Sequence, residues 1–179
     1  MLKKILVALF VLITIGVAYF SYSLWINPKS PASTAIYTSE TLNIEVAYNR
    51  PYKRGRLIFG TQEQNALLEY GKYWRLGANA PTTIKMDRDV LFAGNELKTG
   101  KYRLYAIPYD NRWELFVNTE MGLLGYSPPD KAHDLFSVSV PLTSPLSPME
   151  QFTISFENTN MGVEMIMQWD NHKISIPIQ

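Results

Sequence analysis

Short segments in which apolar and polar residues alternate recur along most of this chain. In residues 42–48, Leu42, Ile44, Val46 and Tyr48 alternate with mostly polar neighbours. A period of two is typical of a β-strand that buries one face in a core. The same pattern, or a short β-prone run, occurs at residues 82–86, 90–93, 96–97, 101–107, 113–118, 135–140, 151–156, 163–169 and 173–178. Repetition of this period predicts a mainly β domain.

Turn residues separate these segments. Gly94-Asn95, residues 108–112 and residues 170–172 each lie between two strand candidates, which is typical of antiparallel hairpins. Three prolines make residues 141–148 an expected irregular crossover, and the one short soluble helix is expected at residues 62–69. Many short strands with turn signals between them predict an antiparallel β-sandwich or jelly-roll-like domain.

An uncharged stretch from Ile5 to Ile26 precedes this domain. At ~1.5 Å per residue it spans roughly 33 Å, enough for the ~30 Å hydrocarbon core of a bilayer. Lys3 and Lys4 come before it, and Tyr22 and Trp25 lie near its far end. Positive charge on the cytoplasmic side and aromatic residues at the interface are typical of membrane anchors. We therefore expect one N-terminal transmembrane helix in the inner membrane, through residues 5–26, with the C-terminal domain periplasmic.

A cleaved signal peptide is the alternative, and it would leave the domain secreted to the periplasm. No A-x-A site follows the apolar run, and residues 21–23 are a poor substitute. We favour an anchor at residues 1–26. The polar, proline-containing residues 27–40 are predicted to be a linker, and residues 41–179 the β domain.

Composition excludes several kinds of site. The chain has no cysteine, so disulfides, thiolate zinc sites and a cysteine nucleophile are excluded. Without Lys3 and Lys4, 15 basic residues face 16 acidic ones, which does not favour a nucleic-acid partner. The two histidines, His133 and His172, have no metal-ligand spacing and no G-x-S-x-G motif accompanies them. We expect no metal, no cofactor and no catalytic residue.

One region stands out by its charge. Residues 50–75 hold six basic and two acidic residues, whereas residues 110–170 hold nine acidic and two basic ones. Either the two segments face each other and the arginines hold loops in place, or the basic region forms a cleft for a small anionic or carbohydrate ligand. For the cleft, the candidate ligand-binding residues are Arg50, Arg56, Tyr70, Trp74, Arg75, Asn79 and Thr82.

The same region resembles the DUF2911 family, which has no characterised function. Family motifs similar to Y-G-R-P-x-x-K-G-R-x-I-F-G, P-Y-G-K-x-W-R-x-G-A-N-E-A-T and G-x-Y-x-L-x-x-I-P occur here at residues 48–60, 69–82 and 100–108. The resemblance covers residues 41–178. It implies a secreted or envelope-associated β domain of Bacteroidetes-like bacteria, and it implies no activity. Ala80-Pro81 stands where Glu-Ala is usual, so no carboxylate is expected beside Asn79.

Three functions remain open at the level of the sequence. We favour a non-catalytic binding or interaction module whose partner is a small ligand or an envelope protein. The alternatives are a hydrolase or carbohydrate-active enzyme that uses carboxylates in the same Arg/Trp cleft, and a structural envelope protein whose motif only stabilises loops. Exposure of the motif residues would separate a binding surface from a structural one.

Overall fold

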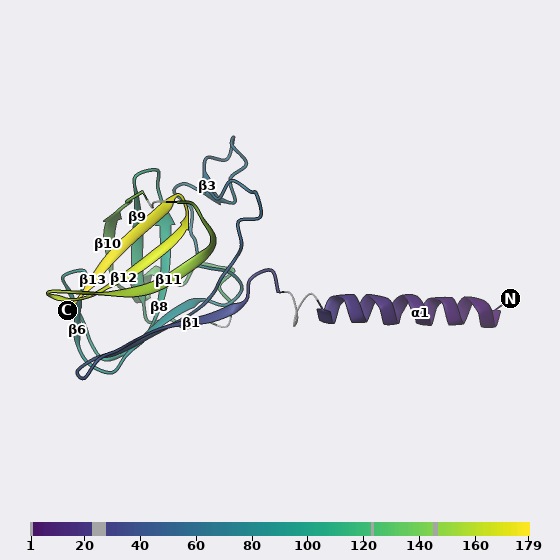
Figure 1. Cartoon of the computed structure of the whole chain (residues 1–179), viewed down its shortest axis with the longest axis horizontal. Helices are drawn as coiled ribbons and strands as arrows, with labels where there is room; N and C mark the ends of the chain where they lie inside the picture. Colours follow the sequence, from purple (N-terminus) through teal and green to yellow (C-terminus); the bar gives the residue numbers. More distant parts are fainter. Residues whose placement is uncertain (1, 23–27, 123, 145–146) are drawn as a thin grey trace.

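The computed structural model describes residues 2–22, 28–122, 124–144 and 147–179. Helix α1 (Leu2–Ser21) extends away from the β domain (Figure 1), and none of its described side chains is buried. The helix is long and apolar enough to cross a membrane, a property that signal sequences share. Tyr22 is exposed, and the expected interface residue Trp25 lies outside the described residues.

Two antiparallel sheets form the body of the domain, as the sequence predicted. The first contains β1 (Ala32–Thr38), β2 (Asn43–Asn49), β5 (Thr82–Met86), β8 (Gly100–Pro108), β9 (Arg112–Asn118) and β10 (Asp134–Pro141), side by side in that order. The second contains β11 (Met149–Thr159), β12 (Gly162–Asp170), β13 (His172–Ile178), β6 (Val90–Phe92) and β7 (Asn95–Leu97), again in that order. Strand β1 lies near β11, and β10 lies near β13.

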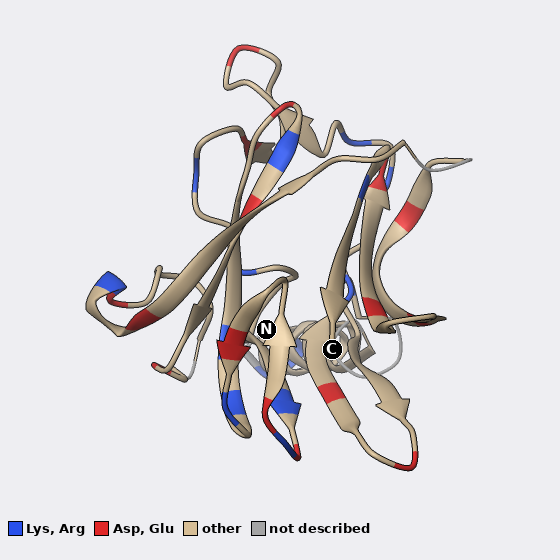
Figure 2. Cartoon of the chain, turned by 90° about the vertical axis from the view of Figure 1, so that its left-hand side faces the viewer, with Lys and Arg blue, Asp and Glu red and all other residues tan. Residues whose placement is uncertain are grey.

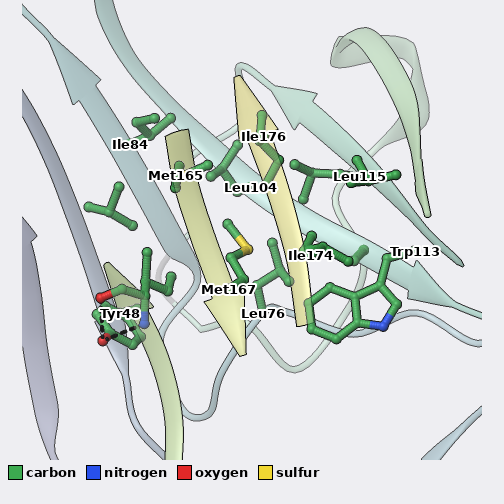
Figure 3. Packing of buried hydrophobic residues seen from close by; sticks show 14 of the residues in the cluster. Tyr48, Leu76, Ile84, Leu104, Trp113, Leu115, Met165, Met167, Ile174 and Ile176 are labelled. Atoms are coloured by element: carbon green, nitrogen blue, oxygen red, sulfur yellow. Dashed lines mark hydrogen bonds between the residues drawn. The ribbon is translucent and has the colours of Figure 1, made fainter. Parts of the chain in front are cut away.

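The core lies between the two sheets. Figure 3 shows Ile84, Leu104 and Leu115 of the first sheet facing Met165, Met167 and Ile174 of the second sheet, and all are buried. Alternation explains this arrangement, because every second residue of each strand points to the same face. Residues of both sheets belong to one continuous apolar cluster. The fold is therefore a β-sandwich.

Tyr48 joins the two sheets through its hydroxyl group. The Tyr48 hydroxyl accepts a hydrogen bond from the Ile154 N–H at 2.9 Å and donates one to the Ile154 carbonyl at 3.4 Å. The ring also packs edge-on against Phe152. A buried tyrosine hydroxyl needs such partners. Tyr48, the first residue of the motif at residues 48–60, is therefore a structural residue of the core.

Part of the predicted linker is a strand. Ala32 to Thr38 form β1, which pairs along the whole of β2 from Ala32↔Asn49 to Thr38↔Asn43. The segment is composed mainly of small or polar residues, and its inward face is only half-buried because β1 is a sheet edge. Its apolar alternation is therefore weak, which is why the sequence pattern indicated a spacer.

The predicted helix at residues 62–69 is wrong. Residues 62–65 form turns, and β4 (Leu68–Glu69) pairs in parallel with β3 (Phe59–Gly60). The N–H groups of Leu67 and Leu68 donate to the carbonyls of Leu57 and Ile58, across the loop. Asn65 has φ 54°, which a helix does not allow. The predicted crossover is described at residues 141–144 and 147–148, and there Thr143 forms an isolated bridge with Lys173.

Candidate functional site

Arg50 and Arg56, two of the predicted ligand-binding residues, bond mainly to the protein's own backbone. The Arg50 Nε donates to the Phe152 carbonyl at 3.2 Å, and its Nη2 donates to the Thr153 hydroxyl at 2.8 Å. The Arg56 Nε donates to the Lys53 carbonyl at 3.0 Å, and its Nη2 donates to the Tyr52 carbonyl. Arg50 thereby ties its loop to β11, and Arg56 closes the turn that precedes it.

Trp74 and Thr82 lie in the interior. Trp74 is 3% exposed and packs edge-on against Phe59 and Trp113, while its indole Nε1 donates to the Gly77 carbonyl at 3.2 Å. Thr82 is fully buried, and its hydroxyl donates to the Leu76 carbonyl at 2.5 Å. Neither side chain offers a surface to a ligand.

Tyr70 lies half-buried at the edge of the same aromatic group. Its ring is parallel to that of His172, with 6.4 Å between centroids. Burial raises the pKa of its phenol, and the charge of Asp110 adds to this effect. The tyrosine therefore stays neutral and packs as an aromatic residue.

Arg75 and Asn79 are different, because they reach the outer face of the six-stranded sheet. Trp74 forms a bridge with Ala106 of β8. The segment that contains Trp74 therefore continues the sheet beyond the N-terminal end of β5, where Thr82 pairs with Leu104. Side chains alternate along such a segment. Trp74 and Leu76 point into the core, whereas Tyr73 and Arg75 point outward.

Five polar residues meet on this outer face, and we call them the outer-face cluster: Tyr73, Arg103, Tyr105, Asn118 and Asp134. The Arg103 Nη2 donates to the Tyr73 hydroxyl at 2.7 Å, and the Tyr105 hydroxyl donates to Asp134 Oδ2 at 2.8 Å. The Asn118 amide donates to Asp134 Oδ1 at 2.7 Å. Strand pairing causes this convergence, because Asn118 of β9 lies opposite both Arg103 of β8 and Asp134 of β10.

A loop after β9 covers the cluster. The Ser127 carbonyl accepts from Arg103 Nη2 at 2.9 Å, and the Gly125 carbonyl accepts from the Tyr73 hydroxyl at 3.1 Å. The Gly125 N–H in turn donates to the Asn79 carbonyl at 2.9 Å. Arg75 packs against Gly125, and its guanidinium lies 5.5 Å from the ring centroid of Tyr126. The predicted residues Arg75 and Asn79 therefore border the cluster.

Burial within the cluster is deep. Arg103 and Tyr105 are each 2% exposed, and Asn118 is fully buried. Burial raises the pKa of the Tyr105 phenol, and the hydrogen bond to Asp134 raises it further. Tyr105 also stacks on Phe116, with 4.5 Å between ring centroids. Polar groups are rarely enclosed on the outer face of a sheet without a reason, because they lose their hydration there.

The charged segments of the two halves meet in space. Lys53 Nζ lies 2.5 Å from Asp170 Oδ1, and the backbone N–H of Arg54 donates to Glu150 Oε1 at 2.8 Å. Figure 2 shows positions of both signs interspersed over the domain. These contacts are the ones expected if the basic and acidic segments face each other.

The two histidines lie in different parts of the domain. Neither side chain belongs to the outer-face cluster, although His133 directly precedes its member Asp134. His172 stacks on Phe59 at 4.1 Å and belongs to the aromatic group around Trp74, whereas His133 is exposed in the 3₁₀ turn η2 (Lys131–His133). Within the described ranges, no three His, Asp or Glu side chains are grouped so that they could hold a metal ion.

Arg103 is the residue that the sequence did not single out. It lies on the polar face of the predicted strand at residues 101–107, where an exposed arginine is ordinary. Its burial depends on Tyr73 and on the loop at Ser127, which lie 30 and 24 residues away. A local sequence pattern does not predict that these distant segments bury Arg103.

The comparisons with known proteins give one match. A family model described as a protein of unknown function, DUF2911, matches residues 30–178. The match begins at the edge strand β1 and ends with β13, so it covers both sheets. No curated protein and no solved structure matches the chain.

Proposed function

Because this chain belongs to the DUF2911 family of proteins of unknown function, we propose its role from its own geometry: a non-catalytic binding module held at a membrane. Helix α1 is the anchor in the inner membrane, and the β-sandwich lies in the periplasm. The binding site is the outer-face cluster, bordered by Arg75 and Asn79.

One observation carries the binding role: polar side chains from three strands and a preceding loop are enclosed on a face that the sandwich does not need to bury. The core is complete without them, since Leu104, Ala106 and Leu115 already fill the inner face. Enclosing Arg103 and Asn118 removes hydration from groups that water would otherwise satisfy. A cluster of this kind is best explained by recognition of a polar ligand.

The anchor is supported by the helix itself. Its side chains from Ile5 to Phe20 are apolar apart from Thr14, and the described ones are exposed. Exposed apolar area of that length is stable in lipid and not in water. Lys3 and Lys4 favour a cytoplasmic N-terminus, which supports a sandwich on the other side of the membrane.

A ligand screen tests the binding role. The full-length chain in detergent is heated, and intrinsic tryptophan fluorescence reports unfolding with envelope sugars, peptidoglycan fragments and organic anions. We expect a compound of these classes to raise Tm, and Tyr73→Phe to reduce that rise because it removes the hydroxyl between Arg103 and Gly125. Tyr52→Phe, outside the cluster, is the matched control. Absence of any response across the three classes would contradict the binding role.

Single-cysteine labelling tests the topology, because the chain has no cysteine of its own. Asn160→Cys lies in the exposed turn between β11 and β12, and Lys3→Cys precedes the apolar segment while keeping Lys4. An impermeant maleimide should label Asn160→Cys in intact spheroplasts and Lys3→Cys only after lysis. The reverse pattern would rule out a periplasmic domain. A mature chain that lacks its first residues would show secretion after cleavage instead of anchoring.

A further inference from the structure

Arg103 is a buried cation that has no anionic partner among the described residues. Its Nη2 donates hydrogen bonds to the Tyr73 hydroxyl and to the Ser127 carbonyl. Its Nε is buried and has no acceptor in the part of the chain that the structure describes. Ion pairs among the described residues join Lys53 to Asp170 and Lys98 to Asp89, and neither involves Arg103.

The acidic residue of the cluster, Asp134, makes its hydrogen bonds to residues other than Arg103. Both carboxylate oxygens of Asp134 already accept hydrogen bonds, from Tyr105 and from Asn118. Glu120, at the start of the covering loop, accepts from the Asp130 N–H at 2.7 Å. Arg103 therefore has neutral dipoles as its contacts, while burial removes the water that would stabilise its charge.

The guanidinium is also fixed in orientation. Tyr73 and Ser127 hold Nη2 from two sides, and among the described residues neither Nε nor Nη1 has an acceptor. Gly122 faces Nη1, and a Cβ at position 122 would come within 3.1 Å of that nitrogen. A glycine at this position keeps side-chain atoms away from the free side of the guanidinium.

We propose that Arg103 is the anion-binding residue of the outer-face cluster, and that it takes the oxyanion of a small carboxylate- or phosphate-bearing ligand. This inference rests on the proposed binding role and names the ligand class for the same site. An oxyanion supplies the negative charge that no described residue pairs with Arg103, and it accepts hydrogen bonds from the unpaired N–H groups of the guanidinium. Charge-assisted hydrogen bonds are strong in an environment with little water, so one arginine can decide affinity.

The test measures anion binding to the full-length chain in detergent. Sodium phosphate and sodium acetate are titrated separately, each against sodium chloride at the same ionic strength, while tryptophan fluorescence reports Tm. Arg103→Met removes the charge and keeps much of the side-chain volume. Arg112→Met, at an exposed arginine of β9, is the matched control. We expect Tm to rise with at least one oxyanion, and the midpoint concentration to increase about tenfold or more in Arg103→Met alone.

A second measurement does not depend on the stability of a variant. In the wild-type chain, the ¹⁵N–¹H resonance of Arg103 Nε should shift on addition of the oxyanion and stay in place with chloride. A wild-type Tm that responds equally to all three salts, an unchanged midpoint in Arg103→Met, or a stationary Nε resonance would each overturn the proposal. If neutral sugars bind at the cluster and oxyanions do not, the anion inference fails while the proposed binding role stands.

Discussion

The indole Nε1 of Trp113 donates a hydrogen bond to Nδ1 of His172, at a distance of 3.2 Å. Nδ1 can accept this bond only when it carries no proton, so the imidazole is neutral. Phe59 stacks on the same ring with nearly parallel planes. Burial lowers the pKa of His172 from 6.5 to about 4, and the charge of Asp170 opposes that shift.

This relationship predicts an acid-sensitive fold. Between pH 6.5 and about pH 4, the unfolded chain binds a proton at His172 that the folded chain does not bind. The free energy of unfolding should therefore fall as pH drops through this window, by about 1–2 kcal/mol after allowance for partial solvent exposure. Urea denaturation at several pH values measures it. His172→Phe should lose this slope, whereas His133→Gln should keep it. Equal slopes in wild type and His172→Phe would contradict the assignment.

The fold was largely predictable because its strands bury one face. The alternation at residues 163–169 and 173–178 predicted β12 and β13, and Asn171 forms the turn between them. Strand β1 escaped prediction because an edge strand of small residues carries little apolar contrast. The helix expected at residues 62–69 is absent because the N–H groups of Leu67 and Leu68 bond across the loop to Leu57 and Ile58. Helix propensity does not encode such bonds between separate segments.

The candidate site was predictable only at its border. The charged and aromatic stretch led to Arg75 and Asn79, which do contact the covering loop. It also led to Trp74 and Thr82, which the sandwich buries, because a motif rich in tryptophan and arginine looks alike in a core and in a cleft. Arg103 depends on contacts between distant segments. Its charge is visible in the sequence, but its isolation from carboxylates is not.

Gly77 should be among the least tolerant positions of the family motif. Its φ is +143°, and a Cβ added there would lie 2.6 Å from the Asn49 carbonyl oxygen. Both strain and overlap with backbone predict that Gly77→Ala lowers the free energy of unfolding by about 2–4 kcal/mol. Gly55→Ala is the control, because Gly55 has φ +69° with nothing within 4 Å of the added Cβ. Equal losses in chemical denaturation would show that the Asn49 contact is unimportant.

Arg75 should matter more for stability than for any single ligand contact. Its Nη1 donates to the Asn79 carbonyl at 3.4 Å, and its side chain packs on Gly125 and lies near the Tyr126 ring. Loss of this packing in Arg75→Ala should lower the free energy of unfolding by about 1 kcal/mol. Arg88→Ala, at an exposed position, should change it little. An unchanged Tm together with a lost ligand response would show instead that Arg75 is a ligand contact.

Tyr105 should make the fold sensitive to alkali. Its hydroxyl donates to Asp134, and burial together with that bond raises the pKa of the phenol above its usual value of 10. Above pH 10 the unfolded chain releases this proton while the folded chain retains it, so stability should decrease as pH rises. Tyr105→Phe should cost about 1–2 kcal/mol at neutral pH, because Asp134 loses a buried donor, and should flatten the alkaline decrease. Tyr126→Phe, at an 81% exposed ring, should do neither. Absorbance at alkaline pH measures the ionisation of the tyrosines, and urea denaturation measures the stability. If Tyr105 of the wild-type chain ionises at the same pH as the exposed tyrosines, the bond to Asp134 does not hold the proton.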